Sequence, residues 1–201
     1  MGSRSAKTLY PALILTGIIF LLAHAAWGAV DCLKCHPEKA QGKVVHPAVQ
    51  MGCESCHSGV DASTTPHKFT GKFGLSALPP ELCFQCHDKA KFTKKIQHPP
   101  VKNGQCLTCH TPHSGPYGSL LRAEGNDLCL KCHAEITQKP HVVMDLLPNG
   151  HLLVGPSDPV RKGKPFGCVS CHVPHSSDWG RLFRYKADNA RDLCKYCHGF
   201  L

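Results

Sequence analysis

The sequence is organised around one short motif, Cys-x-x-Cys-His, which occurs seven times. The cysteine pairs are Cys32 and Cys35, Cys53 and Cys56, Cys83 and Cys86, Cys106 and Cys109, Cys129 and Cys132, Cys168 and Cys171, and Cys194 and Cys197. The histidines that follow them are His36, His57, His87, His110, His133, His172 and His198. The chain has 14 cysteines, so the seven motifs use all of them.

This motif is typical of the covalent attachment of haem c. Both thiols add across the vinyl groups of one porphyrin, and the adjacent histidine becomes the proximal ligand of the iron. The sequence therefore predicts seven covalently bound haem c groups. Zinc ribbons need two cysteine pairs per metal, which leaves one pair over. A disulfide framework would give no reason for the recurring histidine.

The remaining histidines supply the second half of the prediction. Of the 15 histidines, seven follow the motifs and His24 lies in the apolar N-terminal segment. The others are His46, His67, His98, His113, His141, His151 and His175. The equal numbers predict that every iron has two imidazole ligands, although the sequence does not say which distal histidine serves which haem. For any one of them the alternative is an imidazole that binds no iron.

Methionine ligands would raise the reduction potential of a haem. After residue 28 the sequence contains only Met51 and Met144. We therefore expect a set of low-potential haems with two histidine ligands each.

Residues 1–28 have the pattern of a secretory signal peptide. Arg4 and Lys7 precede an apolar run that ends near the small residues around Trp27. An uncleaved membrane anchor is the alternative, because the run approaches the length of a membrane span. Export is expected because haem c is attached outside the cytoplasm. We predict a periplasmic location, with a membrane-anchored or extracellular protein as alternatives.

Residues 29–201 are expected to form one domain with seven haems. With 18 Gly and 16 Pro in the chain and few apolar runs, the polypeptide alone has little to bury. The predicted fold class is mostly irregular, with short α-helices and little or no β structure, built around a stack of covalently bound haems. The haem-free chain should be unfolded.

Short helices are expected where Asp127 and Asp192 stand near a helix start, where an acidic side chain is favourable. Residues Glu38–Lys43 and Leu182–Leu193 are further helix candidates. Residues Ser58–Pro80 and Lys139–Lys164 contain Gly and Pro and are predicted to be loops.

The motifs also form an internal repeat. A lone motif at 32–36 is followed by paired-motif units at about 46–87, 98–133 and 141–198. These pairs resemble the doubled CXXCH-motif family of multihaem c-type cytochromes, most closely over 106–133 and 168–198. The first unit departs from the pattern, because no histidine stands three residues after His57, and His67 is expected to take that role.

The resemblance implies haems with two histidine ligands, stacked alternately parallel and perpendicular, and a role in respiratory electron transfer. The protein would be a soluble carrier or the haem subunit of a respiratory or extracellular conduit, without catalytic residues. Its expected partners are redox proteins, with a quinol-oxidising membrane cytochrome upstream and an outer-membrane or terminal acceptor downstream. Association with a membrane complex is a further option.

Two alternative functions remain at this stage. One is a subunit of an extracellular cytochrome filament, and the other is a multihaem reductase of a small oxyanion, which needs an iron with an open coordination position. The formal net charge of +9 does not predict nucleic-acid binding. Each haem with its propionates brings about −1 when oxidised and about −2 when reduced, which offsets that excess. The basic run at Lys89–Lys95 would face propionates or, alternatively, dock an acidic redox partner.

Overall fold

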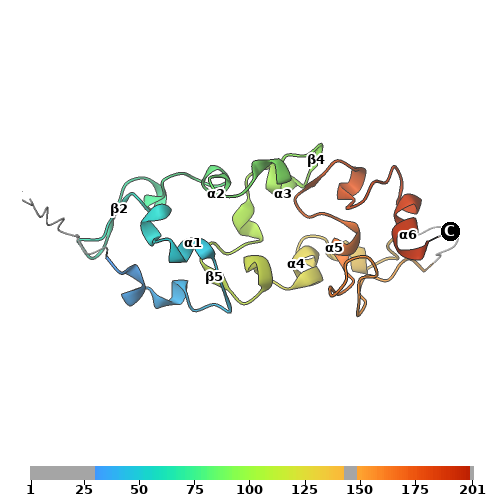
Figure 1. Cartoon of the computed structure of the whole chain (residues 1–201), viewed down its shortest axis with the longest axis horizontal. Helices are drawn as coiled ribbons and strands as arrows, with labels where there is room; N and C mark the ends of the chain where they lie inside the picture. The colour runs from blue at the N-terminus through green and yellow to red at the C-terminus, as the bar shows by residue number, and fades with distance from the viewer. Residues whose placement is uncertain (1–29, 143–148, 200–201) are drawn as a thin grey trace, which may run out of the picture. The chain divides into compact units, whose positions relative to one another are not determined.

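The computed structural model of the protein describes residues 30–142 and 149–199 (Figure 1). The predicted signal peptide at residues 1–28 lies outside these ranges. Within the described ranges no helix has both the length and the apolar character that crossing a membrane requires.

Helical structure in the described residues is confined to short turns joined by irregular connections (Figure 1). The α-helices are α1 (Pro47–Gln50), α2 (Glu81–Phe84), α3 (Pro99–Lys102), α4 (Gly125–Leu130), α5 (Cys168–Cys171) and α6 (Ala190–His198). The 3-10 turns are η1 (Cys32–Lys34), η2 (Pro37–Lys39), η3 (Cys53–Ser55), η4 (Lys72–Gly74), η5 (Lys89–Lys91), η6 (Cys106–Thr108), η7 (Gly118–Leu120), η8 (Ala134–Thr137) and η9 (Gly180–Leu182).

The helix starts follow from local sequence. Pro47 and Pro99 are the first residues of α1 and α3, where the fixed φ of proline suits a helix and its missing N–H costs nothing. The predicted acidic residues are confirmed, since Asp127 lies in the first turn of α4 and Asp192 in the first turn of α6. Asn189 caps α6, its side-chain oxygen accepting from the Asp192 N–H at 3.3 Å.

Both of the other helix candidates are wrong over most of their length. In the first, only the 3-10 turn η2 forms, because Gly42 lies against Gly115 and the chain continues as a strand. In the second, η9 ends at Leu182 and α6 begins only at Ala190. The residues between are held by a backbone bridge from Phe183 to His172, so they cannot close helical turns.

The β structure of the described residues consists of three antiparallel ladders of two residues per strand and three isolated bridges, which agrees with the predicted fold class. The ladders pair β1 (Val44–Val45) with β5 (Ser114–Gly115), β2 (Val60–Asp61) with β3 (Lys68–Phe69), and β4 (Ile96–Gln97) with β6 (Ser176–Ser177). The β1–β5 and β4–β6 ladders are called the clasps. The β1–β5 clasp joins the segment before the second motif to the segment after the fourth. The β4–β6 clasp joins the segment before the fourth motif to the segment after the sixth.

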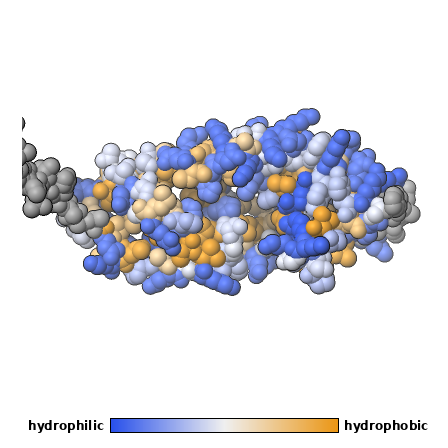
Figure 2. All heavy atoms as spheres, in the orientation of Figure 1, coloured by the Kyte–Doolittle hydropathy of each residue, from blue (hydrophilic) through white to orange (hydrophobic). Residues whose placement is uncertain are grey.

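The polypeptide contributes a very small hydrophobic core. Among the described residues the buried apolar side chains are Phe183 and Ala187, whereas Asp158, Ser170, Ser176 and Ser177 are the buried polar ones. Figure 2 shows apolar side chains scattered among hydrophilic ones over the face in view. A chain of this size normally buries far more apolar surface, so its stability has to come from another source.

Candidate haem sites

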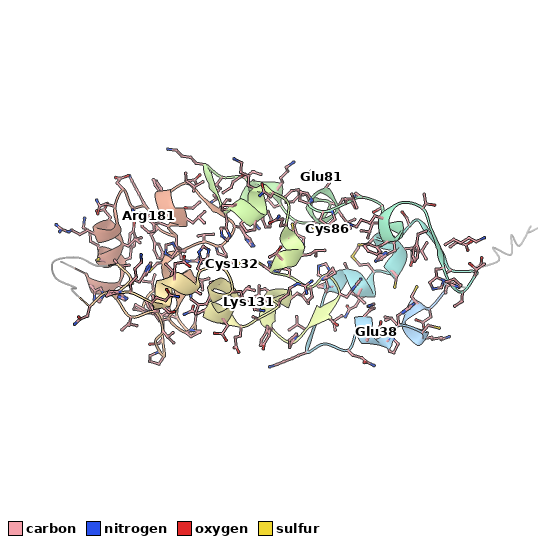
Figure 3. All side chains as sticks on the ribbon, turned by 180° about the vertical axis from the view of Figure 1, so that it is seen from behind. Glu38, Glu81, Cys86, Lys131, Cys132 and Arg181 are labelled. Atoms are coloured by element: carbon pink, nitrogen blue, oxygen red, sulfur yellow. The ribbon has the colours of Figure 1, made fainter. Side chains whose placement is uncertain are left out.

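Each Cys-x-x-Cys-His motif folds as one helical turn. Six of the motif histidines donate their backbone N–H to the carbonyl of the first cysteine of the motif, at 2.9–3.1 Å. The seventh, His198, closes α6, which contains its whole motif. One turn therefore carries both thiols and the imidazole. Figure 3 labels Cys86 and Cys132, the second cysteines of the third and fifth motifs.

Every motif histidine has a second imidazole facing it. The pairs and their ring-centroid distances are His36 and His67 (6.1 Å), His57 and His113 (6.0 Å), His87 and His46 (6.1 Å), His110 and His175 (6.0 Å), His133 and His98 (6.1 Å), His172 and His141 (6.4 Å), and His198 and His151 (6.2 Å). Each of the seven spare histidines of the sequence occurs once in these pairs.

This spacing fits a six-coordinate iron. An imidazole nitrogen lies about 2 Å from a bound metal ion, so two ligands on opposite sides have nitrogens about 4 Å apart. The distance from each nitrogen to its ring centre adds about 1 Å at either end, which gives about 6 Å between centroids. The observed pairs at 6.0–6.4 Å match that value. The donor set and its geometry thus suit haem c.

The clasps position four of the spare histidines. His46 directly follows β1 and donates its backbone N–H to the carbonyl of His113, which precedes β5, at 2.7 Å. In the second clasp His98 donates to the carbonyl of His175 at 3.0 Å. Each clasp therefore delivers two distal imidazoles to two neighbouring motifs.

Serine side chains support both clasps. The hydroxyl of Ser114 accepts the N–H of Gly42 at 3.2 Å, and the hydroxyl of Ser176 accepts the N–H of Lys94 at 3.2 Å. Ser176 also donates its hydroxyl to the Lys91 carbonyl at 2.9 Å. These bonds tie residues that are distant in sequence, so the pairing of histidines is set by tertiary structure.

The other three spare histidines come from the segments at 58–80 and 139–164, which we call the first and second insertions. His67 lies in the first, where its Nδ1 faces the Thr64 carbonyl at 2.8 Å. His141 and His151 lie in the second, where the N–H of His151 donates to the His141 carbonyl at 2.8 Å. The Nδ1 of His151 faces the Leu152 carbonyl at 2.9 Å. A backbone acceptor at Nδ1 leaves Nε2 free to bind a metal.

In the second, fourth and sixth motifs, a backbone carbonyl orients the ring of the motif histidine. The Nδ1 atoms of His57, His110 and His172 lie 2.9, 2.8 and 2.8 Å from the carbonyls of Phe73, Ser119 and Arg181, respectively. These three acceptors lie in η4, η7 and η9 and have φ values of 54–56°, a conformation that turns the carbonyl toward the imidazole. Arg181 is labelled in Figure 3.

In the first and fifth motifs, a carboxylate faces the Nδ1 atom of the motif histidine instead of a backbone carbonyl. Nδ1 of His36 lies 3.8 Å from Oε1 of Glu38, and Nδ1 of His133 lies 3.7 Å from Oε1 of Glu135. All four side chains are about half exposed. Glu38 is labelled in Figure 3 on the segment that follows the first motif.

Burial favours the ligand form of several distal imidazoles. Desolvation lowers the pKa of His98, His113, His141 and His175 below the ordinary histidine value. Since a metal binds only the neutral imidazole, a lower pKa keeps these rings ready for coordination.

The motifs follow one another in space in their sequence order. The thiol of Cys32 acts electrostatically on that of Cys53, Cys106 acts on Cys83, and Cys168 acts on Cys129. In the same way Cys56 acts on Cys83, Cys129 on Cys109, and Cys194 on Cys171. Each motif therefore lies within electrostatic reach of the next, from the first motif to the seventh.

The three carbonyl acceptors are site residues that the motif count does not reveal. In two of the three cases a signal is present in the sequence. Ser119 and Arg181 each stand nine positions after a motif histidine, within Gly-Ser-Leu-Leu-Arg and Gly-Arg-Leu-Phe-Arg. Phe73 lacks that signal, because the first insertion separates it from His57.

Comparison with known proteins agrees with these features. The family model described as the doubled CXXCH motif matches residues 46–92, 98–138 and 158–200. The chain is also similar to the multiheme cytochrome MtrA of Shewanella baltica (strain OS185), at 30% identity over 112 residues. That match covers 52% of this chain but only 31% of the relative, so the chain corresponds to a minor part of that protein.

Proposed function

The chain belongs to the doubled CXXCH motif family of multihaem c-type cytochromes, and from that premise we propose that it carries electrons along seven haems in an unbranched series. Covalent haem c and electron transfer follow from the family. The number of haems, their ligands and their order are our proposals.

One observation carries this proposal. Each of the seven motif histidines faces a different spare histidine at 6.0–6.4 Å, so the described residues would hold each of seven haem irons with two imidazoles. The 14 cysteines supply two thioether bonds for each haem. We propose the pairing given by the rings, in which His67, His113, His46, His175, His98, His141 and His151 serve the first to seventh haems, respectively.

Bound haem c would supply an iron that is oxidised and reduced by one electron, and electrons can tunnel between neighbouring haems. The polypeptide binds the groups, sets their order and orients the proximal imidazoles through backbone carbonyls. The electrostatic effects between the sulfurs of successive motifs support the order, because a haem is attached at each pair of sulfurs. No residue needs to act as acid, base or nucleophile.

The ring pairs favour electron transfer over the oxyanion-reductase alternative. A reductase needs an iron with an open position, whereas each proposed iron already has two imidazoles. Within residues 30–142 and 149–199, no feature favours the filament alternative over a soluble carrier or a conduit subunit.

We also propose that the protein works in the periplasm, exported through residues 1–28. Its partners would be redox proteins, with a quinol-oxidising membrane cytochrome upstream and an outer-membrane or terminal acceptor downstream. The similarity to a multiheme cytochrome supports this setting.

The deciding experiment is the intact mass of the natively matured protein together with its EPR spectrum. We expect a mass of the polypeptide plus seven haems and low-spin ferric signals that account for all seven irons. Six haems, or a high-spin signal equal to one iron, would contradict the proposed ligand set. A colourless protein with the mass of bare polypeptide would end the proposal altogether.

A further inference from the structure

Asp158 is the most buried charged side chain among the described residues. The residue is 4% exposed, although it lies in the second insertion, which is otherwise largely open to solvent. A buried carboxylate costs free energy unless it is paired and hydrogen-bonded. Its retention here therefore calls for a structural or functional reason.

The carboxylate is fully engaged by nearby donors. Oδ1 accepts the backbone N–H of Val160 at 2.9 Å and of Arg161 at 2.8 Å. Oδ2 accepts the Nε–H of Arg161 at 2.7 Å, and the Ser170 hydroxyl donates to the same carboxylate. Burial alone would raise the pKa of Asp158, but these donors outweigh it and hold the pKa well below its usual range. The side chain is therefore a permanent anion.

This anion lies beside one haem attachment point and within electrostatic reach of a second. Ser170 is an internal residue of the sixth motif and stands next to Cys171. The charge of Asp158 also acts on the thiols of Cys171 and Cys197, which belong to the sixth and seventh motifs. Its contacts thus bring a buried negative charge to the junction between the last two motifs.

Two arginines, Arg161 and Arg184, lie near the Asp158 carboxylate, and both are more exposed to solvent than it is. The Arg161 side chain is 23% exposed, whereas that of Asp158 is 2% exposed. Arg184, from the segment after η9, is part-buried and donates to the backbone carbonyls of Val169 and His172. Tyr185 lies close enough to feel the Asp158 charge but remains neutral at physiological pH. Solvent screens the outward guanidinium of Arg161 more than the enclosed carboxylate.

We propose that the Asp158 carboxylate is a fixed negative charge that lowers the reduction potentials of the sixth and seventh haems. A nearby anion stabilises the ferric state of an iron centre relative to the ferrous state. Arg161 moderates this effect and holds the carboxylate in place. The inference rests on the proposed haem pairing. It means that the sixth and seventh haems are more readily oxidised than they would be without Asp158.

The test uses two single substitutions with opposite expected signs in the haem-loaded protein. Asp158→Asn removes the anion and keeps the shape, so about two of the seven haems should titrate at higher potential in spectroelectrochemistry. Arg161→Gln removes the cation, so the same fraction should move to lower potential. The double variant should lie between the two single variants.

Asp178→Asn is the matched control, because Asp178 is half exposed and pairs with Lys94 on the surface at 3.6 Å. It should leave the titration curve unchanged. Shifts of the same sign in Asp158→Asn and Arg161→Gln would indicate a structural role and overturn the inference. A shift in Asp158→Asn no larger than in Asp178→Asn would do the same.

If Asp158→Asn loses haem, Arg161→Gln alone decides. A lowered potential supports the inference, and an unchanged one overturns it. Intact mass of the wild type separates this result from a failure of the proposed function, because fewer than seven haems there would count against the haem assignment itself.

Discussion

At the residue scale, the motif histidines differ in what faces the ring nitrogen away from the iron. Three rings face a backbone carbonyl within hydrogen-bonding distance, and two face a carboxylate at longer range. A carboxylate pulls the Nδ1 proton more strongly than a carbonyl does, which makes the imidazole a stronger donor to the metal. The haems should therefore differ in potential according to these partners.

Replacing Glu135 by Gln should raise the potential of the fifth haem by roughly 10–60 mV, since 59 mV is a tenfold change for a one-electron couple. The effect is small because Glu135 is 57% exposed and lies 3.7 Å from the imidazole. Spectroelectrochemical titration measures it. Glu124→Gln, which changes an exposed glutamate before α4 that faces no motif histidine, serves as control. Equal curves for both variants would remove the carboxylate from the set of tuning groups.

Replacing His113 by Met should raise the potential of one haem, the second, by more than 100 mV, a rough figure at about 59 mV per tenfold change. The reason is that thioether ligation favours ferrous iron, and His113 faces His57 at 6.0 Å. All seven haems should stay attached, because the thioether bonds are unaffected. An unchanged redox titration would show that His113 is no ligand.

At the element scale, the clasps connect distant parts of the chain and so choose the ligand pairs. β1 lies next to β5, and the packing leaves no space for a side chain at Gly42. A Cβ there would lie 2.4 Å from the Gly115 nitrogen and 2.8 Å from the Ser114 Cβ. Those atoms follow His113 directly, so crowding at Gly42 would reach the distal imidazole.

Gly42→Ala should push β5 away from β1 and weaken the second haem's distal ligand, giving a high-spin signal of up to one iron in seven. It should also cost about 1–3 kcal/mol in the free energy of unfolding, as is usual for overpacking. EPR and thermal denaturation measure the two effects. Gly118→Ala is the control, because nothing lies within 4 Å of a Cβ at that position. A fully low-spin Gly42→Ala protein would mean that the clasp does not set the ligand.

The sequence predicts the ligand inventory but not its connections. Counting motifs and spare histidines predicts His46 and His113 as ligands because those signals are local. Their partners, His87 and His57, are fixed by backbone bonds between segments on either side of three intervening motifs. The predicted helix at 182–193 is wrong over most of its length for the same reason. The bridge from Phe183 to His172 overrides the local helical preference after η9. Phe73 could not be found from the sequence, because the first insertion breaks the nine-residue spacing after the motif histidine that holds at Ser119.

At the scale of the whole molecule, the polypeptide provides connections rather than a core. Apart from Phe183 and Ala187, the apolar side chains of the described residues remain at least partly exposed. A chain of this kind cannot offset its conformational entropy by burying its own side chains. Porphyrins bound between the facing imidazoles would supply the missing apolar surface.

The polypeptide expressed without haem attachment should therefore be unfolded. Far-UV circular dichroism should show a disordered chain with no cooperative thermal transition, and protease should cut it many times faster than the haem-loaded form. The haem-loaded protein is the control under the same conditions. A cooperative transition in the haem-free chain would show that the protein part has a sufficient core after all.

The β1–β5 clasp has a consequence for the order of biosynthesis. In the proposed pairing, His57 emerges from the ribosome well before His113, yet the two face the same iron. Haem attachment at Cys53 and Cys56 alone therefore leaves the second site without its remaining ligand. The same holds for His110 and His175 in the β4–β6 clasp. A chain truncated before the later strand of either clasp would lack a ligand that the earlier motif needs.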